Sequence, residues 1–208
     1  VIDKCYHGSV DETFATLDSR GNTVKREGNI GAPVDLSETT RVVEFNNLDA
    51  MEKALKKGDV AAILMEPAMT NIGIVLPEPG YLEGVGKLAK KYGAVWIIDE
   101  THTISVGPGG MTALYGLKPD VLTIGKAIAG GIPTGTFGMT HEVAARIKEK
   151  TSREIIDTGG IGSTLAGNSM SLAAMRATLT KVLTPAAFEK MVALGTKWSD
   201  GVDAAIKE

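Results

Sequence analysis

A carboxylate and an amine follow two apolar runs of the sequence. Val95–Ile98 (VWII) is followed directly by Asp99 and Glu100, and Val121–Ile124 (VLTI) is followed by Lys126 after a single glycine. Both runs are short, β-branched and bounded by turn residues, which predicts strands buried on both faces of a sheet. Ligands bind outside the carboxyl ends of strands in open α/β sheets, so we expect Asp99 and Lys126 to face one crevice.

Two interpretations of this pair are open. Buried charges need partners, so Asp99 and Lys126 could form a structural ion pair without any catalytic role. However, Lys126 is followed by Ala-Ile-Ala-Gly-Gly-Ile-Pro, and glycines near a lysine allow a flat or phosphorylated ligand to approach the backbone. A desolvated lysine loses its proton readily and can form a Schiff base, and pyridoxal phosphate needs an aspartate beside its pyridinium nitrogen.

The elements that must position these residues alternate between strand and helix patterns. A buried strand at Ala61–Met65 leads to Glu66, and apolar spacing predicts a helix that includes Leu82–Ala89. The stretch 18–40 is polar and punctuated by glycine and proline, which indicates a long loop. We also expect a strand at Arg41–Asn46 and helices at Leu48–Gly58, His141–Lys150 and Pro185–Glu208.

The motifs around the two charges resemble those of one enzyme family. Ile97–Thr103 (IIDETHT) and Pro119–Gly135 (PDVLTIGKAIAGGIPTG) resemble the class III, fold-type I pyridoxal-phosphate aminotransferases, in particular the glutamate-1-semialdehyde aminomutase-like branch. The match extends to Tyr6–Gly8 (YHG), Met65–Gly93 and Ser163–Asn168 (STLAGN), and so covers most of the chain in family order. It is specific for the cofactor and much less specific for the substrate.

The resemblance implies an α/β fold, the three-layer α/β/α large domain of a fold-type I enzyme. Its sheet would be mostly parallel, with one antiparallel strand at Gly135–Met139. Residues 1–208 would form this pyridoxal-phosphate-binding catalytic domain. Because the chain starts in what reads as the end of a strand, we expect a fragment that lacks the family's N-terminal segment and its C-terminal small domain.

Carried over residue by residue, the resemblance makes Lys126 and Asp99 the catalytic residues. The residues that it places around the cofactor are Tyr6, His7, Glu66, Asn71, Asp99, Thr101, His102, Lys126 and Thr164.

Several of these residues would have distinct roles by resemblance. Tyr6 would stack on the cofactor ring, Thr101 would pack on the opposite face, and His7 would lie behind the residues that touch the ring. Glu66 would lie near the ring and help set the charge preference for the substrate. Their sequence context alone also fits a surface turn for Tyr6, a structural histidine for His7 and an ordinary ion pair for Glu66.

A glycine-rich turn precedes the helix that is expected to begin near Asn168. Such turns bind phosphate through backbone N–H groups, although the residues fit a plain flexible loop equally well. The resemblance implies that Thr164 reaches the cofactor phosphate of the partner subunit. The protein would then be a homodimer with its active site at the subunit interface.

Two segments depart from the pattern of the aminomutase branch. Ala68–Gly73 (AMTNIG) replaces an amide- and glycine-rich continuation, and Thr101 and His102 replace the usual valine and methionine.

Gly107–Gly110 (GPGG) lacks the GxGxxG spacing of a dinucleotide-binding loop. We interpret it as a mobile loop near the active-site entrance.

The predicted activity is that of a pyridoxal-phosphate-dependent aminotransferase working through a Lys126 Schiff base. It would transfer an amino group between an amino acid, with a β-amino acid or an unusual α-amino acid as candidates, and a keto acid. An aminomutase or racemase on the same scaffold is the first alternative. A non-catalytic fragment is the second.

Composition supports small-molecule partners. A net charge of −3 offers no basic surface for nucleic acid, and the longest apolar runs are far shorter than the roughly 20 residues that a membrane helix needs. No signal peptide is visible, and the single cysteine, Cys5, suits a reducing compartment, so we expect a cytoplasmic protein. Cys5 lacks metal-ligand neighbours in the sequence, and no metal site is predicted.

Overall fold

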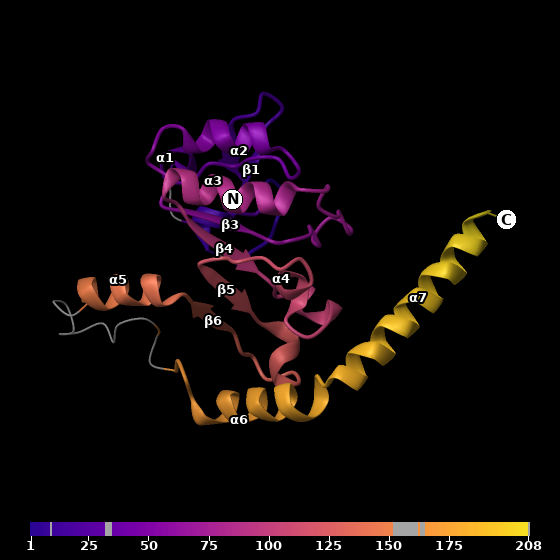
Figure 1. The fold of residues 1–208 in the computed structure, drawn as a ribbon. Coiled ribbons are helices and arrows are strands. Elements are labelled where there is room, and N and C mark those ends of the chain that lie inside the picture. Colours follow the sequence, from indigo (N-terminus) through magenta and orange to yellow (C-terminus); the bar gives the residue numbers. More distant parts are fainter. Residues whose placement is uncertain (9, 32–34, 152–161, 163–164, 208) are drawn as a thin grey trace. The chain divides into compact units, whose positions relative to one another are not determined.

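The computed structural model describes residues 1–8, 10–31, 35–151, 162 and 165–207. The chain divides into two compact units (Figure 1). The first contains Val1–Asp99 and Leu117–Thr123, and the second contains Glu100–Gly116 and Ile124–Glu208.

A parallel sheet forms the centre of the first unit. The strands β3 (Ala62–Met65), β4 (Val95–Asp99) and β5 (Val121–Ile124) confirm the strands expected from the three apolar runs. Asp99 stands opposite Thr123 in the register of β4 and β5, so the two strands end at the same edge of the sheet. The residues of β5 are all half-buried, which is less burial than its apolar sequence predicted.

Asp120 fixes the alignment of β4 with β5. Its carboxylate accepts a hydrogen bond from the Trp96 N–H at 2.8 Å, and its own N–H donates to the Trp96 carbonyl at 2.9 Å. The register matters because a slip by one residue would turn every side chain to the opposite face of the sheet. Asp120 thus helps to set which residues of β4 and β5 reach the sheet edge together.

The helices α2 (Leu48–Leu55) and α3 (Tyr81–Tyr92) pack together over one face of this sheet (Figure 1). The Asn47 side chain caps α2 by accepting from the Ala50 N–H at 2.9 Å, and Gly93 in the left-handed conformation ends α3. The core residues between helices and strands are Met51, Leu55, Ile63, Met65, Leu82, Val85, Ala89, Trp96 and Ile98.

Glycine in α3 makes this packing possible. A Cβ on Gly86 would lie 2.8 Å from the Trp96 ring, and a Cβ on Gly84 would lie 2.5 Å from Leu48. Side chains at these positions would therefore push α3 away from β4 and from α2. The helix predicted around Leu82–Ala89 is confirmed, with Leu82, Val85 and Ala89 buried.

The outer part of the first unit differs from the prediction. Its elements are η1 (Asp11–Thr13), an antiparallel pair of strands β1 (Ala15–Leu17) and β2 (Thr23–Lys25), and α1 (Leu36–Thr39). The stretch 18–40 is thus not one long loop, because β2 and α1 lie within it. Their three and four residues are too few to produce a visible periodicity.

The prediction of a strand at Arg41–Asn46 is wrong as well. Val43 forms only an isolated parallel bridge to Ile2. The left-handed backbone of Asn46, with φ of 61°, then turns the chain, and the Asn46 side chain bonds the Leu76 carbonyl and the Glu78 N–H. An apolar run can therefore be buried without extended pairing.

The second unit is built mainly from helices and short turns. Its elements are η2 (Thr103–Val106), α4 (Gly110–Leu114), η3 (Lys126–Ala129), β6 (Thr136–Met139), α5 (His141–Thr151), α6 (Ser169–Ala177), η4 (Thr178–Val182) and α7 (Pro185–Lys207). The strand predicted near Gly135–Met139 and the helices predicted at His141–Lys150 and Pro185–Glu208 are confirmed within a residue or two at their ends. The Asn168 side chain caps α6 by accepting from the Ser171 N–H at 2.9 Å.

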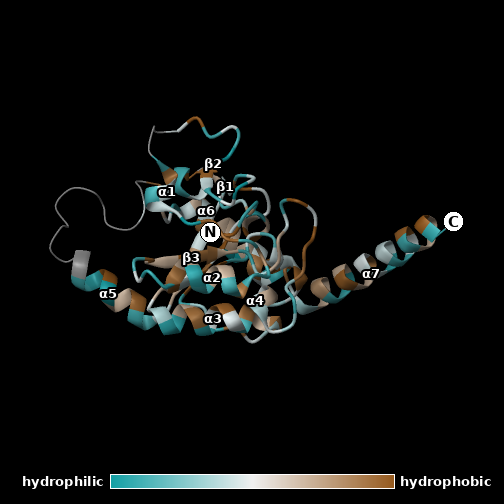
Figure 2. Cartoon of the chain, turned by 90° about the horizontal axis from the view of Figure 1, so that it is seen from above, coloured by the Kyte–Doolittle hydropathy of each residue, from teal (hydrophilic) through white to brown (hydrophobic). Residues whose placement is uncertain are grey.

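Hydrophobic residues recur along α7, as the brown bands of Figure 2 show. Only Phe188 of this helix is buried. The large exposed apolar residues of α7 are Met191, Val192, Leu194, Trp198 and Ile206.

Candidate functional site

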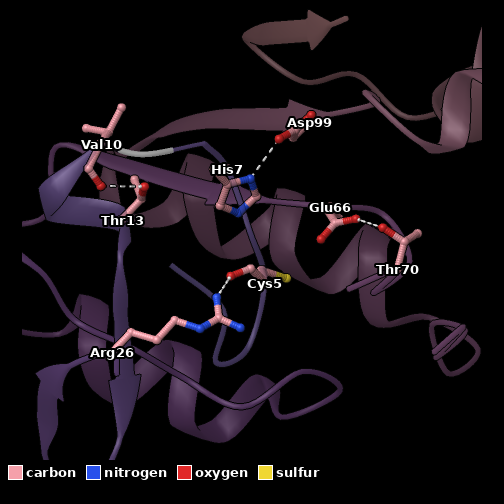
Figure 3. A network of polar contacts seen from close by, with 8 residues as sticks. All are labelled: Cys5, His7, Val10, Thr13, Arg26, Glu66, Thr70 and Asp99. Carbon is pink, nitrogen blue, oxygen red and sulfur yellow. Dashed lines mark hydrogen bonds and ion pairs between the residues drawn. The ribbon is translucent and has the colours of Figure 1, made fainter. Parts of the chain in front are cut away.

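Asp99 is held by a buried histidine at the carboxyl end of β4. The Asp99 residue is 8% exposed, and its Oδ2 lies 2.7 Å from Nδ1 of His7, whose side chain is 3% exposed (Figure 3). An ionised carboxylate can only accept hydrogen bonds, so the His7 Nδ1–H donates to Asp99. This contact fixes the direction of the carboxylate and the ring together.

The other nitrogen of His7, Nε2, is buried without a hydrogen-bond partner among the residues that the structure describes. With Nδ1 bonded to Asp99, the His7 ring can orient this carboxylate. The sequence indicated that His7 would lie behind the residues that touch a ligand, but nothing in its pattern identified Asp99 as the group that it contacts.

Glu66 and Asn71 lie around the loop that carries Tyr6 and His7. Glu66, which follows β3, is 3% exposed and accepts a hydrogen bond from the Thr70 hydroxyl (Figure 3). The Asn71 side chain donates to the carbonyl of Lys4 at 3.2 Å. The segment after β3 is therefore tied to the loop that precedes His7.

Cys5 lies in the same loop and is buried. Burial, and then the charge of Glu66, raise the pKa of the Cys5 thiol to about 12. The Arg26 guanidinium donates to the Cys5 carbonyl at 2.9 Å (Figure 3), which holds the loop from the other side. Tyr6, in contrast, is 41% exposed and meets the edge of the Phe14 ring at a centroid distance of 6.1 Å.

Lys126 begins η3 in the second unit. Its φ of 49° is left-handed, which is uncommon for a residue other than glycine and is found at functional sites where surrounding contacts hold it. Ile128 and Ala129, 0% and 2% exposed, anchor the turn. The Lys126 side chain is exposed, so the described part of the chain does not provide the desolvation that the sequence suggested.

Thr101 lies beside the backbone that leads into Lys126. A Cβ placed on Gly125 would be 3.6 Å from Cγ2 of Thr101 and 3.6 Å from the carbonyl oxygen of Thr134. Gly125 is therefore a buried point of contact between two neighbouring segments of this unit. His102, the next residue after Thr101, is exposed.

Glu100 is a residue whose role the sequence analysis missed. It is 0% exposed, and its carboxylate accepts hydrogen bonds from the Thr103 hydroxyl at 2.5 Å, from the Met111 N–H at 3.2 Å and from the Thr112 N–H. The GPGG segment, interpreted as a mobile loop, ends at Gly110, which begins α4 and lies against this carboxylate. Two consecutive acidic residues at a strand end were the available signal, because neighbouring side chains of a strand point to opposite faces.

One predicted site residue cannot be placed. Thr164 lies outside the described residues. A cavity of about 410 Å³ in the first unit, bordered by Arg41, Asp59 and residues of β3, includes none of the predicted site residues. Within the described ranges there is no cluster of metal-binding side chains, and no helix has the length and apolar character required to span a membrane.

Comparisons with known proteins point to one family. The family model described as aminotransferase class-III matches residues 1–207. The glutamate-1-semialdehyde 2,1-aminomutase of Anaeromyxobacter dehalogenans (strain 2CP-C) is 38% identical over 210 residues, which cover 100% of this chain and 47% of that protein. The chain thus spans about half the length of the curated relatives that it matches.

Solved structures agree with this family. The crystal structure of a glutamate-1-semialdehyde-aminomutase from Pseudomonas aeruginosa PAO1 is 44% identical, with a TM-score of 0.92 over 99% of this chain and 46% of that one. A variant of that enzyme, 43% identical, was solved in complex with PMP. An omega-transaminase from Sphaerobacter thermophilus is 29% identical, with a TM-score of 0.79 over 99% of this chain and 48% of that one. The α/β fold class expected from the sequence, that of the fold-type I enzymes, is confirmed.

Proposed function

Because this chain belongs to the class III aminotransferase family, we propose that it carries the pyridoxal-phosphate site of an enzyme that moves an amino group within or between small molecules. The observation that supports this most directly is the buried contact between His7 and Asp99 at the end of β4. The neighbouring strand β5 is parallel to β4 and in register with it up to Asp99 and Thr123, and Lys126 follows β5 in the sequence after a single glycine.

The residues present fit the cofactor. The Asp99 carboxylate, oriented by His7, is the kind of group that pairs with the protonated ring nitrogen of this cofactor. When bound, pyridoxal phosphate supplies an electron sink, provided that its ring nitrogen keeps a proton. The Asp99 carboxylate would stabilise the proton on the ring nitrogen. The Lys126 amine would attach the cofactor and carry a proton to and from the substrate carbon. Tyr6 would cover one face of the ring and Thr101 the other.

Intramolecular amino transfer of the glutamate-1-semialdehyde 2,1-aminomutase type is the reaction supported best. The aminomutase of Anaeromyxobacter dehalogenans is 38% identical and that of Pseudomonas aeruginosa PAO1 is 44% identical, whereas the omega-transaminase is 29% identical. Such a reaction moves an amino group between two carbons of one substrate. It therefore needs no separate keto acid.

Transfer between two substrates is the second candidate. Thr101 and His102 stand where the aminomutase branch commonly has valine and methionine, and both residues lie in the segment that joins β4 to η2. A polar pair at this position would change what packs against a bound substrate. This departure from the aminomutase pattern is the reason to keep transfer between an amino acid and a keto acid as the second candidate.

An assay with and without an added keto acid separates the two candidates. We expect the intact protein loaded with pyridoxal phosphate to convert glutamate-1-semialdehyde without any acceptor. Turnover of an amino donor only when a keto acid is present would favour the aminotransferase. Binding of the cofactor without turnover of either kind would reject both reactions.

We also propose that the active site is completed by a second copy of the chain, with Thr164 of the partner subunit at the cofactor phosphate. Cofactor phosphates bind well at glycine-rich turns ahead of helices, and the segment before α6 has that composition. Light scattering of the intact protein should report a dimer, and a fully loaded monomer would contradict this proposal.

A further inference from the structure

A buried carboxylate closes the segment that follows Asp99. Glu100 accepts hydrogen bonds from Thr103, Met111 and Thr112, and its own carbonyl accepts from the Ile104 N–H at 2.8 Å. Burying a carboxylate is costly unless several donors satisfy it, and here those donors come from both ends of one segment. Glu100 therefore fastens residues 101–112 into a closed ring of chain.

Gly110 allows this contact because it has no side chain. Its φ is 62°, and a Cβ at this position would lie 2.4 Å from Oε2 of Glu100. Gly109, with φ of 81°, precedes it in the same left-handed region. The two glycines bring the N–H groups of Met111 and Thr112 onto the carboxylate, which a residue with a side chain at 110 would prevent.

Helix capping alone does not explain this arrangement. The helix that Glu100 caps, α4, has only five residues, whereas the longer α2 and α6 are capped by the side chains of Asn47 and Asn168. Neutral or exposed caps serve helices at far lower desolvation cost than a carboxylate with no exposure. The carboxylate bonds more than α4, because Thr103 begins η2 and Met111 and Thr112 lie in α4.

The first residue of the closed segment lies near the backbone ahead of Lys126. Thr101 is this first residue, and the Thr101 methyl group lies 3.6 Å from the position that a Gly125 Cβ would take. Lys126 follows with its left-handed φ of 49°. Such a backbone persists only where the surroundings hold it, and Thr101 is close to the residue that precedes Lys126.

We propose that Glu100 is a positioning residue for Lys126. Its carboxylate keeps the 101–112 segment closed, the closed segment keeps Thr101 against Gly125, and this contact fixes the direction in which the Lys126 side chain leaves the backbone. The inference rests on the proposed function, since it concerns the lysine expected to attach the cofactor.

The chain offers a matched pair of substitutions that tests this. Gly110→Ala and Gly116→Ala both place a side chain at a φ of 62°, but the Cβ at 116 meets nothing within 4 Å. Both variants should therefore carry a similar backbone penalty. Only Gly110→Ala should disturb Glu100.

Two measurements on the loaded protein give the result. In Gly110→Ala and in Glu100→Gln we expect the pH titration of the visible cofactor absorbance to shift from that of the wild type. We also expect kcat to fall by about 100-fold with little change in KM, the size of loss that a misplacement of about 1 Å can cause. Gly116→Ala should match the wild type in both measurements.

Thr103→Val, which removes one donor to the carboxylate, provides a milder variant if the others fail to fold, and should show a smaller shift of the same kind. The inference would be overturned if every folded variant at Glu100, Thr103 and Gly110 showed the same pH titration and the same kcat as the wild type and lost only thermal stability. A wild-type protein that takes up no cofactor would instead overturn the proposed function, so the two failures are distinguishable.

Discussion

At the scale of single residues, the adjacent carboxylates of Asp99 and Glu100 have different partners and different roles. Asp99 ends β4 and is held by His7, and Glu100 turns away to fasten the following segment. The sequence identified Asp99 because an acid followed by a distant lysine matches the needs of pyridoxal phosphate. It could not identify Glu100, whose partners are backbone N–H groups that are invisible in a sequence.

Asp99→Asn tests the role of the carboxylate. The amide cannot stabilise a proton on the ring nitrogen, so we expect kcat to fall by about 100-fold or more, as when a preorganised charge is removed from an active site. Steady-state kinetics and circular dichroism of the loaded protein provide the measurement, with the fold expected to stay intact. Turnover equal to the wild type in a folded variant would reject the pairing of Asp99 with the ring.

Cys5 predicts a dependence of stability on alkaline pH. Its pKa is raised from 9.0 to about 12, so between these values the unfolded chain loses the thiol proton while the folded chain keeps it. Fewer protons on the unfolded state mean that stability falls as pH rises, by up to about 1.4 kcal/mol per pH unit. Burial also raises the pKa of Tyr81, which acts in the same direction at higher pH.

Urea unfolding of the wild type and of Cys5→Ala at pH 8 and pH 10.5 checks this. We expect the wild type to lose more stability between the two pH values than Cys5→Ala does. Equal losses would show that the pKa of the Cys5 thiol does not differ between the folded and unfolded states, which would contradict the prediction. In agreement with its 3% exposure, Cys5 should also resist iodoacetamide at pH 8 until the protein unfolds.

At the scale of elements, the sequence predicted those parts of the fold that depend on apolar periodicity. The strands β3, β4 and β5 and the helix α3 were found because their burial pattern extends over four or more residues. Elements as short as β2 carry no such pattern, and the register that Asp120 fixes depends on contacts across strands. These features arise only once the chain has folded.

The packing of α3 on β4 gives a prediction at this scale. Gly86→Ala would place a Cβ 2.8 Å from the Trp96 ring, and overpacking of this kind costs about 1–3 kcal/mol. Gly195→Ala in α7 is the control, because nothing lies within 4 Å of its Cβ and alanine favours a helix. Thermal unfolding should show a lower midpoint for Gly86→Ala only, and an unchanged midpoint would mean that α3 does not pack this closely.

At the scale of the whole molecule, the motifs around Asp99 and Lys126 predicted the family, and the match over residues 1–207 confirmed it. The reaction was harder to predict, because the motifs that hold a cofactor are shared by enzymes with different substrates. The comparisons shift the proposal from an aminotransferase towards an aminomutase. Because Thr101 and His102 differ from the residues of the aminomutase branch, an aminotransferase remains the alternative.

The central claim is that Lys126 attaches the cofactor. The most direct measurement is borohydride reduction of the intact protein incubated with pyridoxal phosphate, followed by peptide mass spectrometry. We predict that the cofactor mass is found on the peptide containing Lys126, and that Lys126→Ala lacks both this modification and the visible absorbance of the bound cofactor. Reduction that leaves Lys126 unmodified, or a Lys126→Ala variant that keeps the same absorbance, would contradict the account.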